Sequence, residues 1–181
     1  MKISPISFTL KNGNTAYLQS PELSDAPELC TYLERTAAET EYVLRYPEEC
    51  KMSLEQEERF ITNVLSSDFD MMAVCKVNGR IAGNCHLMMN NRIKTRHRAS
   101  VAIALYKEYW NLGIGTRMFE MMIEIAKQKG IEQLELEYIE GNVRGEALYK
   151  KMGFETVSFK PNAIRLKDGT SLKEYFMVKT L

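Results

Sequence analysis

The chain lacks any apolar run approaching the roughly 20 residues that a membrane-spanning helix requires. Its first ten residues, Met1 to Leu10, contain no continuous apolar core of the kind that marks a secretory signal peptide. With 45% hydrophobic and 27% charged residues, the composition is that of a globular protein. The 181 residues therefore predict a soluble, cytoplasmic protein that folds as one domain over residues 1–181 and has no membrane partner.

An excess of basic side chains is also missing. The 24 basic and 24 acidic side chains cancel, whereas proteins that bind nucleic acid through its phosphates usually carry a clear positive excess. We therefore predict no nucleic-acid partner. One local cluster, Arg92, Lys94, Arg96 and Arg98 around His97, is interpreted as an alternating strand edge that discourages edge-to-edge pairing. Contact with an anionic partner or a cofactor phosphate is the alternative.

Metal-ligand spacing is absent as well. The four cysteines, Cys30, Cys50, Cys75 and Cys85, form no CxxC pair, and neither of the two histidines has other ligands beside it. We therefore predict no metal site, and free thiols in a reducing cytoplasm.

Turn and cap signals divide the chain into strands and helices. Two Asn-Gly turns, Asn12-Gly13 and Asn78-Gly79, each lie between apolar runs and predict hairpins. Ser53 and Gln56 form the capping-box pattern that begins a helix. This order predicts an α/β domain with a mixed sheet and helices on its faces. The expected elements are strands at 6–10 and 15–19, a helix after Ser24 or Asp25, a helix from Ser53, strands at 71–77, 81–89 and 99–105, a helix at 116–129, a strand at 134–139, a short helix from Asn142 to Met152, and strands at 156–159 and 173–178.

The strand that ends at Leu105 runs into a turn with two glycines, Gly113 and Gly115, and a helix begins at once. Glycine lets the backbone approach a ligand closely, and the first N–H groups of a helix attract anions. A Rossmann loop would need a third glycine where Met118 stands, and the Gly-Lys-Ser/Thr run of a P-loop is absent. The turn favours a pyrophosphate site, with a turn that uses glycine for packing alone as the alternative.

A second pattern lies downstream, where residues 134–154 read LELEYIEGNVRGEALYKKMGF. Together with the run from Ala99 onward, it resembles the GNAT superfamily of acetyl-coenzyme A dependent N-acetyltransferases of bacterial type. The resemblance covers Ala99 to Phe154 closely and the rest of the chain in element order. It implies the acyl-CoA N-acyltransferase fold, with a mixed central sheet of about seven strands, splayed into a V and flanked by helices.

The resemblance also implies a binding site for the donor, acetyl-coenzyme A (acetyl-CoA). Three residues match the strand whose backbone pairs with the pantetheine arm, namely Ile103, Ala104 and Leu105. Seven more match the pyrophosphate loop and the first turn of its helix, namely Trp110, Asn111, Leu112, Gly113, Ile114, Gly115 and Thr116. Family members often have Gln or Arg where this chain has Trp110, so no side-chain contact is carried over from that position. Asn142 matches a residue that commonly contacts the cofactor arm.

Tyr149 matches the usual general acid, which gives a proton to the departing thiolate, and we place it in the donor site as well. It follows Asn142 by seven residues, about two helical turns, so the two share one face of their helix. The alternative is a packed core aromatic beside Leu148 and Phe154.

Glu137 lies where some amine-specific relatives keep a general base, which takes the proton that the attacking amine must lose. An exposed charge on a strand is the alternative, and Glu39 and Glu41 are rival bases. The loop from Glu39 to Glu49 is acidic and aromatic, which suits a cationic amine, although a plain solvated loop has the same composition.

The predicted activity is direct transfer of an acetyl group from acetyl-CoA to a primary amine, carried by a small molecule, a peptide or a protein. A non-catalytic acyl-CoA-binding sensor is one alternative, and a nucleotide-binding protein that uses the glycine turn is another. The sequence leaves the acceptor and the oligomeric state open, including a homodimer.

Overall fold

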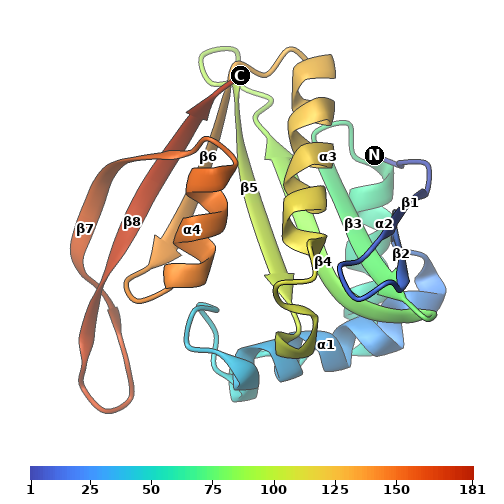
Figure 1. Ribbon diagram of the computed structural model, residues 1–181, viewed down its shortest axis with the longest axis horizontal. Helices are drawn as coiled ribbons and strands as arrows, with labels where there is room; N and C mark the ends of the chain where they lie inside the picture. Colours follow the sequence, from blue (N-terminus) through green and yellow to red (C-terminus); the bar gives the residue numbers. More distant parts are fainter. The chain divides into compact units, whose positions relative to one another are not determined.

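A computed structural model describes all residues, 1–181, and contains eight strands and four α-helices (Figure 1). The helices are α1 (Ala26–Glu39), α2 (Leu54–Ser66), α3 (Ile114–Gln128) and α4 (Val143–Lys151), with short 3-10 turns η1 (Leu23–Asp25), η2 (Pro47–Glu49) and η3 (Lys107–Tyr109). The strands are β1 (Ile6–Thr9), β2 (Thr15–Gln19), β3 (Asp70–Val77), β4 (Arg80–Met89), β5 (Arg98–Leu105), β6 (Gln133–Ile139), β7 (Glu155–Arg165) and β8 (Ser171–Thr180). The predicted α/β fold is therefore confirmed.

The strands form one mixed sheet in the order β1-β2-β3-β4-β5-β6-β8-β7. Neighbours with determined registers pair antiparallel, except that β5 and β6 run parallel. The sheet has eight strands where the resemblance implied about seven. The Asn12-Gly13 hairpin supplies two of them, β1 and β2, and the Asn78-Gly79 hairpin joins β3 to β4.

The helix starts differ in how well the sequence predicted them. Ser53 begins α2 through the expected capping box, because its Oγ accepts from Gln56 N at 3.2 Å and its own N donates to Gln56 Oε1 at 2.8 Å. Asp25 precedes α1, but its carboxylate does not cap that helix. It accepts instead from Glu22 N at 3.0 Å and pairs with Lys76 Nζ at 2.6 Å.

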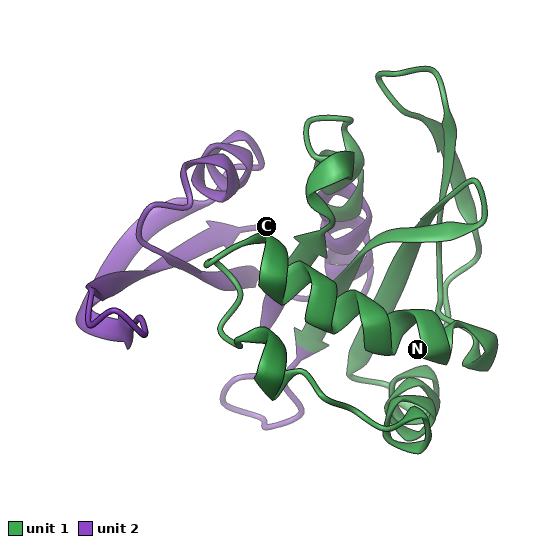
Figure 2. Ribbon diagram, turned by 90° about the horizontal axis from the view of Figure 1, so that it is seen from below, with its two compact units in different colours: residues 1–88, 102–118 green, residues 89–101, 119–181 purple.

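The chain divides into two compact units (Figure 2). Unit 1 comprises Met1–Met88 and Ala102–Met118, and unit 2 comprises Met89–Val101 and Phe119–Leu181. Strand β5 and helix α3 therefore begin in one unit and end in the other. One domain over residues 1–181 stays a prediction.

Unit 1 holds a core between α1, α2 and the adjoining strands. The buried face of α1 contributes Leu29, and that of α2 contributes Ile61 and Val64, all at positions with helical spacing. These residues pack against strand residues such as Val74 and Ile81. The packing holds α1 beside the end of β5, because Ala104 lies against the same cluster.

Unit 2 is organised around aromatic rings. Phe119 on α3 and Phe154, just before β7, are buried with ring centroids 5.5 Å apart. Helix α4 lies over β6 and β8, where Tyr138 and Tyr175 stack at 5.1 Å (Figure 1). This layer supports Tyr149, the candidate acid of the sequence analysis.

The basic cluster lies in a loop, and the prediction of a strand edge is wrong. Residues 91–97 belong to no strand, and two successive turns shape them, with Thr95 N donating to Arg92 O and Arg98 N donating to Thr95 O. Local hydrogen bonds thus shape the segment, and His97 O at its end accepts from Gln133 N at the start of β6. Only Arg98 lies in β5, where it pairs with Glu135 at 2.9 Å.

None of the four helices combines the length and apolarity needed to cross a membrane. All four cysteines are free thiols. No three His, Cys, Asp or Glu side chains converge in a way that could hold a metal ion.

Candidate active site

The end of β5 has a backbone edge that β6 leaves unpaired. The parallel pairing covers three residue pairs, from Arg98 opposite Gln133 to Ser100 opposite Glu135, and stops there. Beyond that point β6 pairs with β8 alone. Ile103, Ala104 and Leu105 are half-buried and lie past the paired stretch. A free edge of this kind is what an extended ligand arm needs to pair with a strand backbone.

Side chains from elsewhere in unit 1 fix the carbonyl groups of this strand end. Tyr32 on α1 is fully buried, and its hydroxyl donates to Ala104 O at 2.6 Å. Burial raises the pKa of the Tyr32 phenol, so the hydroxyl keeps the proton that it donates. The Trp110 indole Nε1 donates to Leu105 O at 3.0 Å. The sequence predicted neither contact, because both depend on how the chain packs.

Glu39 is bound to the backbone just after β5. Its Oε2 accepts from Lys107 N at 2.6 Å, and its Oε1 pairs with Arg35 Nε at 2.9 Å. Arg35 also reaches Glu108 at 2.7 Å and lies 4.2 Å from the centroid of the Tyr106 ring. Both Glu39 oxygens therefore have partners, and the role of Glu39 as a rival general base stays a prediction.

The glycine turn has the backbone conformation that a phosphate loop requires. Asn111 and Gly113 both have positive φ, 63° and 97°, which turns the chain sharply before α3 begins at Ile114. Leu112 O accepts from Lys11 N, and Gly113 O accepts from Arg117 N. A Cβ built on Gly113 would meet no atom within 4 Å, so the space beside the loop is open. The residues therefore fit a pyrophosphate held by backbone N–H groups at a helix start.

Asn142 caps α4 in unit 2, as its sequence position indicated. Its Oδ1 accepts from Gly145 N at 3.0 Å. A Cβ on Gly145 would lie 2.6 Å from Asn142 Nδ2, so the cap needs glycine there. With the oxygen committed to the cap, the carboxamide NH₂ is the group that could reach a ligand.

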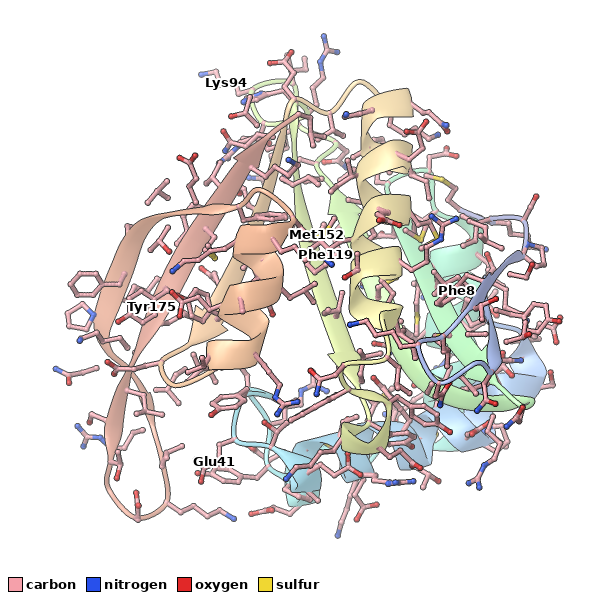
Figure 3. All side chains as sticks on the ribbon, in the orientation of Figure 1. Phe8, Glu41, Lys94, Phe119, Met152 and Tyr175 are labelled. Carbon is pink, nitrogen blue, oxygen red and sulfur yellow. The ribbon has the colours of Figure 1, made fainter.

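Tyr149 projects from α4 into the aromatic layer of unit 2. Its ring centroid lies 5.7 Å from that of Phe119 and 5.9 Å from that of Tyr138 (Figure 3 labels Phe119). Burial raises the pKa of the Tyr149 phenol to about 12. The side chain is therefore protonated at any ordinary working pH. Both contacts are made by the ring, so neither commits the hydroxyl.

Glu137 lies on the opposite face of β6 from Tyr149. Successive strand residues point to opposite faces, and Tyr138 contacts Tyr149 on the α4 side. Glu137 instead reaches Lys160 on β7 at 3.4 Å, in an ion pair whose side chains are 48% and 68% exposed. A pair this exposed is weak, so the carboxylate can exchange this partner for another.

The loop after α1 exposes some of the acidic and aromatic side chains that the sequence analysis considered for an amine acceptor. Glu41 lies there on the exterior (Figure 3), with Tyr42 and Glu48 also exposed. Glu49 is used locally, because its Oε2 accepts from Tyr46 N at 2.8 Å. Glu41, Glu48 and Glu49 are the exposed acidic side chains of the loop that an acceptor can reach.

The predicted site residues fall into two groups. Unit 1 brings together Ile103 to Leu105, Trp110 to Thr116, and the residues of α1 that hold them. Unit 2 holds Glu137, Asn142 and Tyr149 on β6 and α4. Glu39 and Tyr32 were missed as supports of the donor strand, and no local pattern in the sequence marks them.

Comparisons with known proteins identify the family. Residues 29–154, more than half of the chain, match the model of the acetyltransferase (GNAT) family. A Bacillus subtilis (strain 168) protein, provisionally named a ribosomal protein bS18-alanine N-acetyltransferase, is 27% identical over 105 residues. That match covers 57% of this chain and 66%, just under two thirds, of the relative.

Solved structures give the same result. A GNAT-family acetyltransferase from Streptococcus pneumoniae matches with a TM-score of 0.86 and 29% identity, over 92% of this chain and 99% of that one. A ribosomal-protein-alanine N-acetyltransferase from Brucella melitensis shares the fold with a TM-score of 0.78 and 21% identity, over 91% and 99% of the two chains. The chain therefore belongs to the acetyltransferase (GNAT) family, the acetyl-CoA-dependent N-acetyltransferases that its sequence resembles.

Proposed function

We propose that this acetyltransferase moves the acetyl group of acetyl-CoA to the α-amino group of a basic polypeptide that begins with alanine. The observation that carries the chemistry is the placement of Tyr149 and Glu137 on opposite faces of β6. The names of the Bacillus and Brucella relatives suggest the alanine N-terminus. The acidic loop from Glu39 to Glu49 suggests that the polypeptide is basic.

The two units differ in charge although the chain is neutral. Unit 1 holds 14 acidic and 10 basic side chains, a net charge of −4, and unit 2 has the reverse, +4. The loop from Glu39 to Glu49 adds to this, with four acidic side chains against one basic, Arg45. A negative field draws in a cationic substrate and discourages an acidic one. Glu41 and Glu48, on the exterior of this loop, are the side chains that we assign to the acceptor.

The proposed donor site is the free edge of β5 and the turn that follows. The backbone of Ile103, Ala104 and Leu105 would pair with the pantetheine arm, and the N–H groups around Gly113 and Gly115 would hold the pyrophosphate. Trp110, Asn111, Leu112, Ile114 and Thr116 complete the loop. Asn142 is carried over from the family resemblance as a residue that contacts the cofactor arm. The open space at Gly113 supports this assignment.

In the transfer, the amine nitrogen attacks the thioester carbon, a C–N bond forms and the C–S bond breaks. Glu137, alone or through water, takes the proton that the amine loses. Tyr149 hydrogen-bonds to the sulfur as negative charge develops there, and the departing thiolate then takes a proton from solvent. The proposal thus gives the two proton-handling roles to two different side chains, Glu137 for the amine and Tyr149 for the sulfur.

The raised pKa limits what Tyr149 contributes. A phenol with a pKa of about 12 is a weaker acid than a thiol with a pKa near ~8.5. Complete proton transfer to a free thiolate would therefore be uphill by roughly 5 kcal/mol. We infer that Tyr149 stabilises the thiolate mainly as a hydrogen-bond donor, with the final proton coming from solvent.

The test uses three peptides and measures coenzyme A thiol release together with the mass of the product. One peptide has Ala followed by Lys and Arg residues, the second has Glu in their place, and the third is the basic peptide with its α-amine already acetylated. We expect turnover of the basic peptide, a KM at least tenfold higher for the acidic one, and no reaction with the blocked one. Glu41→Gln with Glu48→Gln should raise KM for the basic peptide about fivefold to tenfold.

Three outcomes would contradict the proposal. Equal turnover of the blocked peptide would assign the reaction to lysine side chains. Preference for the acidic peptide would reject the charge argument. Coenzyme A binding without turnover of any amine would favour a sensor.

A further inference from the structure

We propose that Glu39 is a positioning residue that couples the order of the acceptor loop to the occupancy of the donor strand. The acceptor loop is defined as residues 40–52, and the donor strand as Ile103 to Leu105. The inference rests on the proposed function, because it takes both assignments from there. Glu39 is the last residue of α1, so the acceptor loop begins at the next residue.

The contacts of Glu39 connect these two segments. One oxygen accepts from Lys107 N at 2.6 Å, two residues past the end of β5. The other pairs with Arg35, one turn back on α1, at 2.9 Å. The Glu39 side chain is 21% exposed, whereas Arg35 and Glu108 are 43% and 55% exposed. Exposed ion pairs are weak, so we assign the coupling mainly to the carboxylate hydrogen bond with Lys107 N, which is charge-assisted.

The backbone between the donor strand and the phosphate loop is held at successive residues. Tyr32 holds Ala104 O, the Trp110 indole holds Leu105 O, and Tyr106 N donates to Ala82 O at 3.0 Å. Glu39 holds Lys107 N in the same stretch of backbone, and it is also the residue directly before the acceptor loop. A ligand that pairs with the donor strand would restrict Lys107, and through Glu39 the first residues of the acceptor loop.

The experiment measures two quantities on the full chain, with coenzyme A as the probe. Calorimetry gives its dissociation constant, and hydrogen exchange gives the protection of residues 40–52 with and without it. We expect coenzyme A to slow exchange in residues 40–52 of the wild-type protein. Glu39→Gln should raise the dissociation constant about threefold and Glu39→Ala about tenfold, and both should remove most of the loop protection.

The matched control is Glu124→Gln with Glu124→Ala. Glu124 lies on α3, is exposed and belongs to neither segment, so both variants should show wild-type coenzyme A affinity and wild-type protection of the loop. A purely structural role for Glu39 would lower the melting temperature but leave the ligand-induced protection of the loop intact, and that result would overturn the proposal. Glu39→Gln keeps the volume and one acceptor oxygen, so it remains informative if Glu39→Ala unfolds.

Another pair of variants separates failure of the coupling from failure of the donor site. Gly113 and Gly169 both have positive φ, 97° and 91°, and neither has an atom within 4 Å of a built Cβ. Alanine at either position should therefore strain the backbone equally. If the donor site is assigned correctly, only Gly113→Ala weakens coenzyme A binding. Equal coenzyme A affinity in these two variants would reject the donor site. If Gly113→Ala alone weakens binding but the Glu39 variants behave as wild type does, only the coupling is rejected.

Discussion

Tyr149 is the residue whose replacement distinguishes catalysis from packing most directly. The change Tyr149→Phe removes one hydroxyl and keeps the ring that contacts Phe119 and Tyr138. We expect kcat to fall by roughly 10²-fold, the usual range for loss of one hydrogen-bond donor to a developing negative charge, with little change in coenzyme A affinity. Steady-state rates with the basic peptide, together with calorimetry, measure both.

A packing role for Tyr149 predicts the opposite pattern. If only the ring matters, kcat of Tyr149→Phe stays near the wild-type value. The Tyr138→Phe variant is the natural control, because Tyr138 lies in the same ring layer and has no assigned role. A similar loss of kcat in both variants would indicate that the layer as a whole, and not one hydroxyl, supports the reaction.

Single residues also show which hydrogen bonds the sequence could predict and which it could not. Asn142 could be recognised as a cap because its partner, Gly145, is three residues away, and the structure has that hydrogen bond. Tyr32 and Glu39 could not be recognised in this way. Their partners, Ala104 O and Lys107 N, lie 72 and 68 residues away in the chain. Local spacing carries no information about contacts across such distances.

At the scale of elements, Gly83 on β4 lies close against the end of β5. A Cβ there would lie 2.2 Å from Leu105 Cδ2 and 2.5 Å from Ala104 O. The Leu105 side chain can move, but a carbonyl in a strand cannot move without displacing its backbone. Gly83 therefore lets β4 lie against the end of β5 where the donor strand is proposed.

We expect Gly83→Ala to destabilise the fold by about 1–3 kcal/mol and to weaken coenzyme A binding, because Ala104 has to shift. Urea unfolding and calorimetry measure the two effects. Gly79→Ala, in the turn of the same hairpin, is the control, since its φ is positive and its Cβ would meet no atom within 4 Å. It should lose stability through strain alone, about 1–2 kcal/mol, and bind normally. Wild-type affinity in Gly83→Ala would show that the donor does not depend on the position of Ala104.

Elements with local signals were predicted well. Both Asn-Gly hairpins and the capping box at Ser53 are present, and the strand predicted at 99–105 is observed at Arg98–Leu105. The alternating basic residues around Lys94 led to the wrong prediction of a strand edge, because the same alternation is also compatible with consecutive turns. Strand β7 extends to Arg165, past the predicted end at Phe159. Strand β7 pairs with β8 on both sides of an irregularity between Lys160 and Ile164. This pairing extends the strand beyond the residues that the local pattern identified.

At the scale of the whole molecule, the buried thiols predict sensitivity to alkali. Burial raises the pKa of Cys75 and of Cys85 to about 12, from an ordinary value of 9.0. A group whose pKa is raised in the folded state contributes stability that is fully present below its unfolded pKa. That stability is lost as the pH rises from 9 towards 12, because the unfolded thiols ionise first. Between pH 9 and pH 12, each of these two thiols should lower the free energy of unfolding by about 1.4 kcal/mol per pH unit.

Thermal unfolding between pH 8 and pH 10.5 measures this effect. We expect the melting temperature to fall steadily above pH 9, and the slope to be shallower for Cys85→Ala, whatever that variant's stability at pH 8. Cys30→Ala is the comparison, because Cys30 is only partly buried. Identical slopes of melting temperature against pH in wild type and Cys85→Ala would show that other titrating groups cause the loss of stability above pH 9.

The hydrogen bond between Trp110 and Leu105 O has a practical consequence. Trp110 is the only tryptophan in the chain, and its indole is held at the junction of the donor strand and the phosphate loop. Its emission can be excited selectively over the tyrosines, so the intrinsic fluorescence of the unlabelled protein reports from one place. A donor that binds there should change the polarity around the ring and shift the emission. The protein thus carries its own optical probe, which can follow ligand binding in a rapid-mixing instrument before any acceptor is known.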